Sequence, residues 1–428
     1  MSTARVTHPT LITALVAVVA VLGAISVTRV ASPSTTDAAA AAPPPPAALP
    51  REPGFTERGF TERGDRDVQI RVWHQALAAD PISAIAMGQL AALHLQRARE
   101  GGSWDDLRAA EGFARRSLRQ RARRNGATAS TLVSILLAQH RFLDARSIAD
   151  SLVRREPDVP EYRATLAEVL MELGDDAGAD SLFRSVWANR STLTIAARLA
   201  RWLELTNHVA EARRLITSAK VDAWARRDVA SETKAWFALR VGDLELRSGR
   251  LNAAERAFHE GLSVERDDPR LLAAMARLAA ARSNHADVIE WGERAIGLQL
   301  DPATLGLIGD AYLAKHDTIK AAEYLETLNV AVCQQPGAYH RAWSLHLLDH
   351  GLHVSEVLEK AQAELRHRKD VYGYDVVAWA LEKSGRRAEA QRAMRLALRL
   401  NTSDPLLWAH ARAMGLAVTA PPATATGE

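Results

Sequence analysis

The histidines of residues 339–353 form the strongest local concentration of side chains that could bind a metal ion. This stretch, YHRAWSLHLLDHGLH, holds four of the fourteen histidines of the chain. His346 and His350 are four residues apart, so on a helix they share a face and could supply two nitrogen ligands, with His353 or Asp349 nearby. Two ligands are only half of a zinc site, and polar residues that end a solvent-facing helix explain the same pattern. We therefore expect no metal and no cofactor.

The sequence contains none of the short motifs that mark common catalytic sites. It has no P-loop, no G-x-G-x-x-G, no G-x-S-x-G and no H-E-x-x-H. Cys333 is the only cysteine, so no disulfide can form within the chain. His340 follows it seven residues later, but a lone thiol in a loop between repeats is the simpler interpretation. The sequence therefore indicates a protein that is not an enzyme.

The charge of the chain does not indicate a polyelectrolyte partner. Net charge is only +3, although the isoelectric point is near 9.1 and 47 of the 54 basic residues are arginine. The densest run of basic residues could bind the phosphates of lipid or nucleic acid. We favour the interpretation that it forms a solvated helix face on the convex side of the protein. This run consists of Arg115, Arg116, Arg119, Arg121, Arg123 and Arg124. We expect no nucleic acid partner.

A repeated helix-turn-helix unit must position all of these side chains, and residues 301–328 show it best. Its apolar positions are Leu305, Ile308, Gly309 and Tyr312 before a turn at His316-Asp317, and Ala321, Leu325 and Leu328 after it. Gly309 and Ala321 are small enough to let two antiparallel helices touch, while the large residues fill the seam. The unit resembles the tetratricopeptide pattern W-x2-L-G-x2-Y…A-x3-F…P.

The small residue of the second helix recurs at close to the tetratricopeptide period of about 34 residues. It falls at Ala110, Ala145, Ala179, Ala212, Ala254, Val288, Ala321, Val357 and Ala390. The one long interval contains an insertion within residues 219–233. Glycines at 174, 249, 351 and 385 fall in the turn inside a unit. The resemblance implies an all-α superhelical solenoid of about nine repeats over residues 65–418, which opens on a half-repeat.

The two ends of the chain differ from the repeats. Leu11 to Val27 carries no charge, and its length lies between a signal h-region of about 7–15 residues and a membrane span of about 20. We interpret residues 1–30 as a transmembrane anchor or signal peptide, 31–64 as a disordered Ala/Pro-rich tether, and 419–428 as a disordered tail. The repeats would then face the periplasm or cell exterior, and the protein would be secreted if the signal is cleaved.

First helices line the concave surface of such a solenoid, so their inward positions are candidate binding residues. In this register they are Arg198, Arg201, Trp236, Arg240, Asp243, Arg277, Asp310, Tyr372, Asp375 and Trp379. Guanidinium groups suit bidentate contact with carboxylates, which favours an acidic protein or peptide as the partner. In the alternative, the arginines pair with Glu204, Asp243 and their neighbours and only solvate the surface.

These observations favour a non-catalytic protein–protein interaction scaffold, tethered to a membrane through residues 11–27. The alternative is a metal-dependent protein or enzyme with a site in the histidine-rich repeat 339–353. A cytoplasmic co-chaperone is disfavoured, because the Lys and Asn that hold a C-terminal carboxylate in such adaptors are replaced here by Ser130, Ser134 and Thr165.

Overall fold

Helices alone make up the secondary structure of the part of the chain that the structure describes. The computed structural model describes residues 62–101, 104–333 and 340–417. The helices are α1 (Glu62–Ala79), α2 (Ala84–Gly101), α3 (Trp104–Gln120), α4 (Gly126–Ala138), α5 (Phe142–Arg155), α6 (Pro160–Leu173), α7 (Asp176–Ser185), α8 (Leu193–Leu205), α9 (Val209–Ala225), α10 (Ser231–Arg247), α11 (Leu251–Val264), α12 (Pro269–Ala281), α13 (His285–Leu298), α14 (Pro302–Ala314), α15 (Thr318–Cys333), α16 (Arg341–Asp349), α17 (Val354–Glu364), α18 (Val371–Lys383), α19 (Arg387–Ala397) and α20 (Pro405–Ala413).

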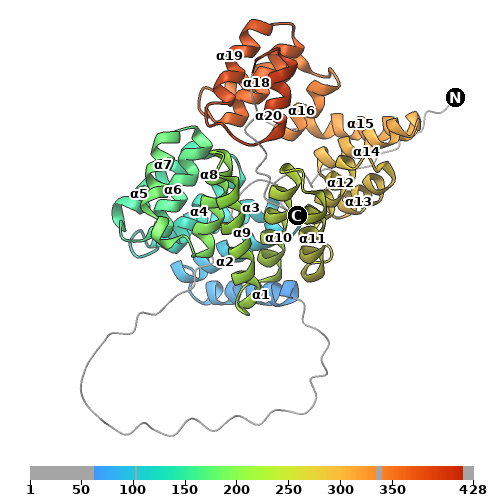
Figure 1. The fold of residues 1–428 in the computed structure, drawn as a ribbon. Coiled ribbons are helices and arrows are strands. Elements are labelled where there is room, and N and C mark those ends of the chain that lie inside the picture. Colours follow the sequence, from blue (N-terminus) through green and yellow to red (C-terminus); the bar gives the residue numbers. More distant parts are fainter. Residues whose placement is uncertain (1–61, 102–103, 334–339, 418–428) are drawn as a thin grey trace, which may run out of the picture.

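Consecutive helices pack as antiparallel pairs, from α2 with α3 to α18 with α19, and the pairs stack along a superhelix (Figure 1). The expected all-α solenoid of nine repeats is thus confirmed. α1 is the unpaired second helix of the opening half-repeat, and α20 covers the last pair. All nine small positions of the predicted register are at most 1% exposed. The register is therefore correct throughout the described repeats.

Local sequence signals explain where several helices begin. α12, α14 and α20 each begin at a proline, whose missing N–H is not needed in the first turn. The aspartate before each proline accepts hydrogen bonds from backbone N–H groups of that turn. At Glu156-Pro157 the same signal only ends α5, and α6 begins later, at Pro160.

The turns and insertions follow the prediction with small differences. The four turn glycines have φ between 68° and 77°, in the left-handed region that glycine adopts without strain. The corresponding turns of four other repeats hold His140, Asn207, Ser283 and His316 in the same region. The insertion within residues 219–233 lengthens α9 and forms the loop before α10. Cys333 is the last residue of α15 and does not lie in the following loop, as we had expected.

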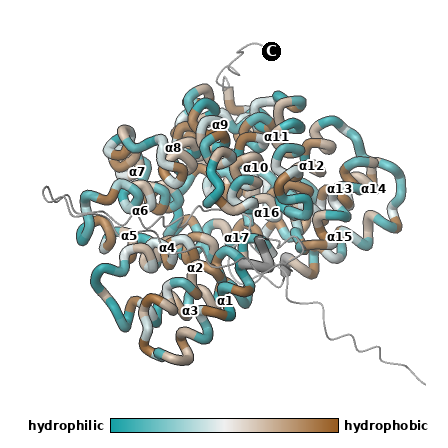
Figure 2. Tube along the Cα trace, turned by 90° about the horizontal axis from the view of Figure 1, so that it is seen from below, coloured by the Kyte–Doolittle hydropathy of each residue, from teal (hydrophilic) through white to brown (hydrophobic). Residues whose placement is uncertain are grey.

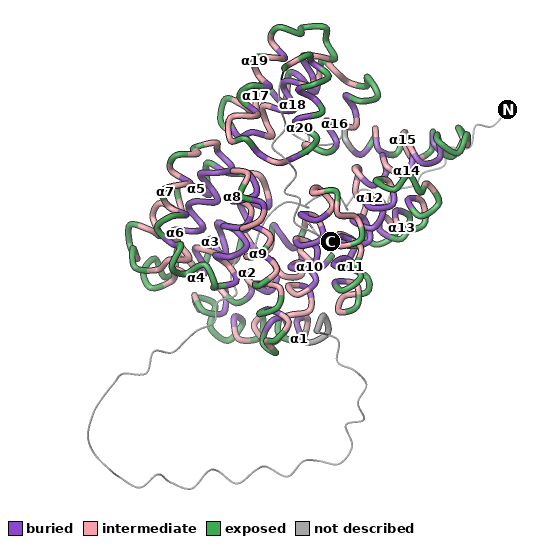
Figure 3. The backbone as a smooth tube through the Cα atoms, viewed as in Figure 1, coloured by how far each residue is buried: buried purple, intermediate pink, exposed green. Residues whose placement is uncertain are grey.

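The apolar sides of the helices form two extended hydrophobic clusters, one from residues 91–257 with Val371 and one from residues 305–414, together with smaller clusters. Hydrophobic and hydrophilic positions alternate along the tube in Figure 2, and Figure 3 shows buried faces toward neighbouring helices with exposed outer turns. Within the described ranges, no helix is both long enough and apolar enough to cross a membrane. The apolar run 11–27, the tether and the tail lie outside the described residues.

The C-terminal repeats return to the N-terminal ones, which periodicity did not predict. Arg368 contacts Glu172 with Nη2 and Oε2 3.1 Å apart, and the Lys369 N–H donates to the Leu173 carbonyl at 3.0 Å. Arg399 forms an ion pair with Asp176 at 2.6 Å. We call these contacts between residues 172–176 and residues 368–399 the closing contact. In Figure 1 they lie where the red helices meet the green ones.

Candidate functional site

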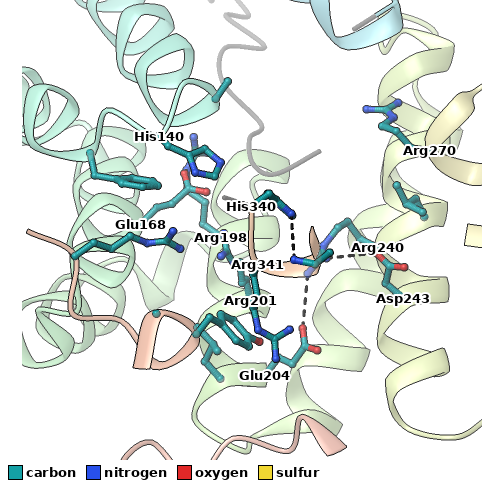
Figure 4. Close-up of a pocket in the computed structure, with 18 of the residues that line it drawn as sticks. His140, Glu168, Arg198, Arg201, Glu204, Arg240, Asp243, Arg270, His340 and Arg341 are labelled. Carbon is teal, nitrogen blue, oxygen red and sulfur yellow. Dashed lines mark hydrogen bonds and ion pairs between the residues drawn. The ribbon is translucent and has the colours of Figure 1, made fainter. Parts of the chain in front are cut away.

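The closing contact turns the concave side of the solenoid into a central cavity of about 410 Å³. Its wall comes mainly from α2, α8 and α10, with single residues of α3, α4, α5, α6 and α12, on one side, and from α16, α17 and α18 on the other. Figure 4 shows charged side chains converging on this space from both groups of helices. The volume lies within the range of about 300–1,000 Å³ that is usual for ligand sites.

Arginines outnumber carboxylates on the described wall of the cavity. The arginines are Arg99, Arg198, Arg201, Arg240, Arg247, Arg270, Arg341 and Arg368. The carboxylates are Glu168, Glu204, Glu232, Asp243, Glu364 and Asp404. Four further carboxylates pair with these arginines from behind the wall, namely Glu172, Asp268, Asp370 and Asp375. The groups that face the cavity itself are therefore mainly guanidinium groups.

Most of these arginines are held by short ion pairs. Arg198 Nε lies 2.8 Å from Glu168 Oε2, and both side chains are buried. Arg247 Nε lies 2.5 Å from Glu204 Oε1. Burial opposes ionisation of Glu204, but Arg247 and Arg240 outweigh it and lower the pKa of this carboxyl. The pairing of groove arginines with carboxylates, which we considered from the sequence, is therefore present.

Arg240 is paired more loosely than its neighbours. Its guanidinium nitrogens lie 3.6 Å from Glu204 and 3.7 Å from Asp243, beyond hydrogen-bond distance. Burial, and then Arg247, lower the pKa of Arg240. A ligand with negative charge would relieve this unfavourable position of the cation.

Arg99 and His140 show the same electrostatic surroundings. Burial lowers the pKa of Arg99 to about 10, an effect that Glu232 opposes and Arg270 increases. Burial and the neighbouring Arg368 lower the pKa of His140 to about 3. Further positive charge is therefore disfavoured at this site, and negative charge is favoured.

Six of the ten predicted binding residues line the cavity, namely Arg198, Arg201, Trp236, Arg240, Asp243 and Tyr372. Trp236 and Tyr372 add aromatic surface, and Arg341 lies over the Tyr372 ring at 4.6 Å from its centroid.

The other four predicted residues have different surroundings. Arg277 pairs with Asp243 at 3.0 Å, just beside the cavity. Asp375 is fully buried between Arg341 and His410, at 2.6 and 2.7 Å. Trp379 donates a hydrogen bond to Asp349 and stacks on His410, and Asp310 contacts His350. These positions have partners within the protein and lie outside the cavity wall.

Sequence reasoning missed several cavity residues. Arg99 and Arg247 lie in the last turns of first helices, and Arg270 and Arg341 lie in first turns, so the inward positions extend further along each helix than we expected. Arg368 is brought in by the closing contact, and its partner Glu172 is 196 residues away. The arginine run 115–124 lies on and after a second helix, mostly exposed, as predicted.

Comparison with known proteins finds only distant structural likeness. No family model matches the chain, and no curated protein matches it. PilF of Pseudomonas aeruginosa is similar to it at 16% identity and a TM-score of 0.39, over 49% of this chain and 93% of that one. A tetratricopeptide repeat protein from Parabacteroides merdae shows 16% identity and a TM-score of 0.39, over 57% and 93%.

A third similar structure is the human IFIT1 dimer with PPP-AAAA, at 14% identity and a TM-score of 0.44, over 80% of this chain and 96% of that one. With TM-scores below 0.5 these likenesses carry no argument about function. The tetratricopeptide-type fold rests on the helix pairs and the register described above.

Proposed function

We propose that this tetratricopeptide-type solenoid is a non-catalytic scaffold whose central cavity holds an acidic segment or free carboxylate of a protein or peptide partner. The observation that carries the proposal is the loosely paired, half-buried Arg240, which faces the cavity together with other arginines. A carboxylate there would replace long ion pairs by charge-assisted hydrogen bonds, which are the stronger kind. The cavity volume suits a side chain or chain terminus of the partner.

Removal of the Arg240 guanidinium will weaken binding of an acidic ligand by roughly tenfold or more, because hydrogen bonds to charged groups contribute about 1.5–3 kcal/mol. The probe is a glutamate-rich peptide with a free C-terminal carboxylate, titrated into wild type and Arg240→Ala by calorimetry at two salt concentrations. Binding will fall with rising salt. The melting temperature of Arg240→Ala will stay close to that of wild type, since its ion pairs are long.

Arg386→Ala is the matched control, because this arginine is exposed and pairs only with its helix neighbour Glu389 among the described contacts. It will bind the peptide as wild type does. Absence of peptide binding, or equal binding by Arg240→Ala, contradicts the proposal. So does preferential binding of an oligoribonucleotide to the cavity. Arg201 is unsuitable for this test, because it pairs at 2.5 Å with the buried Glu172 and its removal will destabilise the fold.

We also propose that residues 11–27 anchor the protein in a membrane and that residues 31–64 hold the repeats outside the cytoplasm. The uncharged apolar run and the proline-rich segment after it support this topology. A reporter that is active only outside the cytoplasm, fused after Glu428, will show activity in cells. Activity of a cytoplasm-only reporter at the same position would contradict this orientation.

A further inference from the structure

Asp310, His346 and His350 lie together on neighbouring first helices, outside the described wall of the central cavity. Asp310 is on α14, His346 is in the last turn of α16, and His350 is the C-cap residue of α16. Asp310 Oδ1 lies 2.9 Å from His350 Nε2, and Oδ2 lies 3.7 Å from His346 Nδ1. One potential ligand atom from each residue falls within 4.8 Å of the other two. The sequence indicated two of these groups and missed the third.

The helix geometry explains why the three groups meet. His350, the C-cap residue of α16, follows His346 by one helical turn, so the two side chains share a face, and their ring centroids are 4.5 Å apart. Gly306 lies one turn before Asp310 on α14. A Cβ at Gly306 would lie 2.7 Å from Cε1 and Nδ1 of the His346 ring. Glycine therefore leaves the space in which this imidazole approaches α14 closely.

The spacing of the donor atoms fits a small metal ion. A tetrahedral ion with bonds of about 2.0–2.1 Å to nitrogen and oxygen holds its ligand atoms roughly 3.3 Å apart. The distances of 2.9 and 3.7 Å from Asp310 to the two histidines lie on either side of that value.

The surroundings of His346 are unusual for a buried histidine that has only a structural role. Its Nε2 is buried and has no hydrogen-bond partner among the described residues. Its Nδ1 is 3.7 Å from Asp310, too far for a hydrogen bond. A buried polar ring normally satisfies at least one nitrogen, because leaving such a group unpaired is unfavourable. A cation bound at Nδ1, the nitrogen that faces Asp310, would give this ring one partner.

We propose that Asp310, His346 and His350 bind one divalent transition metal ion, with Zn²⁺ the best fit to two imidazoles and a carboxylate. The Asp310 and His350 side chains are 41% and 32% exposed, whereas His346 is 11% exposed. The site is thus closed on the His346 side and open toward solvent on the other. Three protein ligands leave a coordination position for water or for a group of a partner.

The test is titration of the metal-free, full-length protein with Zn²⁺ by calorimetry, with Co²⁺ as a spectroscopic probe. Wild type will bind one Zn²⁺ per chain, and Co²⁺ will give the visible absorption of a low-symmetry site. His346→Ala, His350→Ala and Asp310→Asn will each weaken Zn²⁺ binding at least tenfold. Zn²⁺ will raise the melting temperature of wild type and not that of the variants.

His367→Ala is the control, because His367 is an exposed histidine outside this group. It will bind Zn²⁺ as wild type does. Circular dichroism of each metal-free variant checks that the helices are intact, and Asp310→Asn retains the shape of the side chain. Absence of stoichiometric binding overturns the proposal. Equal affinity of wild type and Asp310→Asn also overturns it, because the ion would then lie elsewhere.

Discussion

Replacement of Glu172 by alanine will lower the free energy of unfolding by about 3–5 kcal/mol, the range measured when one partner of a buried ion pair is removed. The Glu172 side chain is 2% exposed and lies 2.5 Å from Arg201 and 3.1 Å from Arg368. Without this carboxylate, the guanidinium groups of Arg201 and Arg368 lose their shared negative partner and repel each other. The effect will appear as a lower midpoint in urea unfolding.

The same replacement has a predictable pH dependence. Burial opposes ionisation of Glu172, but Arg201 and Arg368 outweigh it, so its pKa lies below the ordinary value of 4.5. The ionised carboxylate therefore stabilises the fold at pH values above 4.5, and this contribution is lost as pH falls through the lowered pKa. The difference between wild type and Glu172→Ala will accordingly shrink in acid.

Glu359→Ala is the control for this prediction. Glu359 is an exposed glutamate on α17, and its replacement will change the free energy of unfolding by no more than about 0.5 kcal/mol. If Glu172→Ala is equally mild at neutral pH, the closing contact does not contribute to stability.

Replacement of Gly174 by alanine will disrupt the closing contact by steric overlap. Gly174 has φ of 77°, and a Cβ built there would lie 2.2 Å from the Lys369 carbonyl oxygen. The left-handed backbone costs a residue with a Cβ about 1–2 kcal/mol. Overlap with a neighbouring backbone adds roughly 1–3 kcal/mol, or the two segments separate to avoid it. Urea unfolding and small-angle scattering will detect the lower stability and the larger radius of gyration.

Gly385→Ala separates these two contributions. Gly385 has nearly the same φ, 76°, but a Cβ there would meet nothing within 4 Å. Its replacement will show the backbone effect alone, with an unchanged radius of gyration. Equal losses of stability and equal scattering curves for the two variants would contradict the steric explanation.

Contacts within a repeat and between neighbouring repeats determine those features of the structure that could be predicted from the sequence. The small residue of each second helix must fit against the preceding first helix, so Ala110, Ala321 and Ala390 identify the register without a structure. The turn glycines are equally local, because a left-handed residue is needed in the turn and glycine adopts this conformation without strain. Fold class, repeat number and the inward face of each first helix therefore follow from periodicity.

The closing contact could not be predicted in this way. Arg368 and Glu172 are 196 residues apart, and their meeting depends on a small rotation at every repeat between them. An error of a few degrees per repeat would move the two segments well apart. Asp310 was missed as a neighbour of His346 for a related reason. The sequence indicated only nearby residues, His353 or Asp349, as a third ligand, whereas Asp310 belongs to the preceding repeat. Asp375 was misplaced because its partner His410 belongs to the capping helix α20.

The closing contact also affects how fast a ligand could reach the cavity. An open superhelix accepts an extended chain from the side, so association is limited by diffusion and orientation. In this protein Arg368, Lys369 and Arg399 join the C-terminal repeats to residues 172–176 beside the cavity. A partner that enters between these two segments requires them to separate. The rate of association would then report the opening of the protein, and a partner enclosed in this way would also leave slowly.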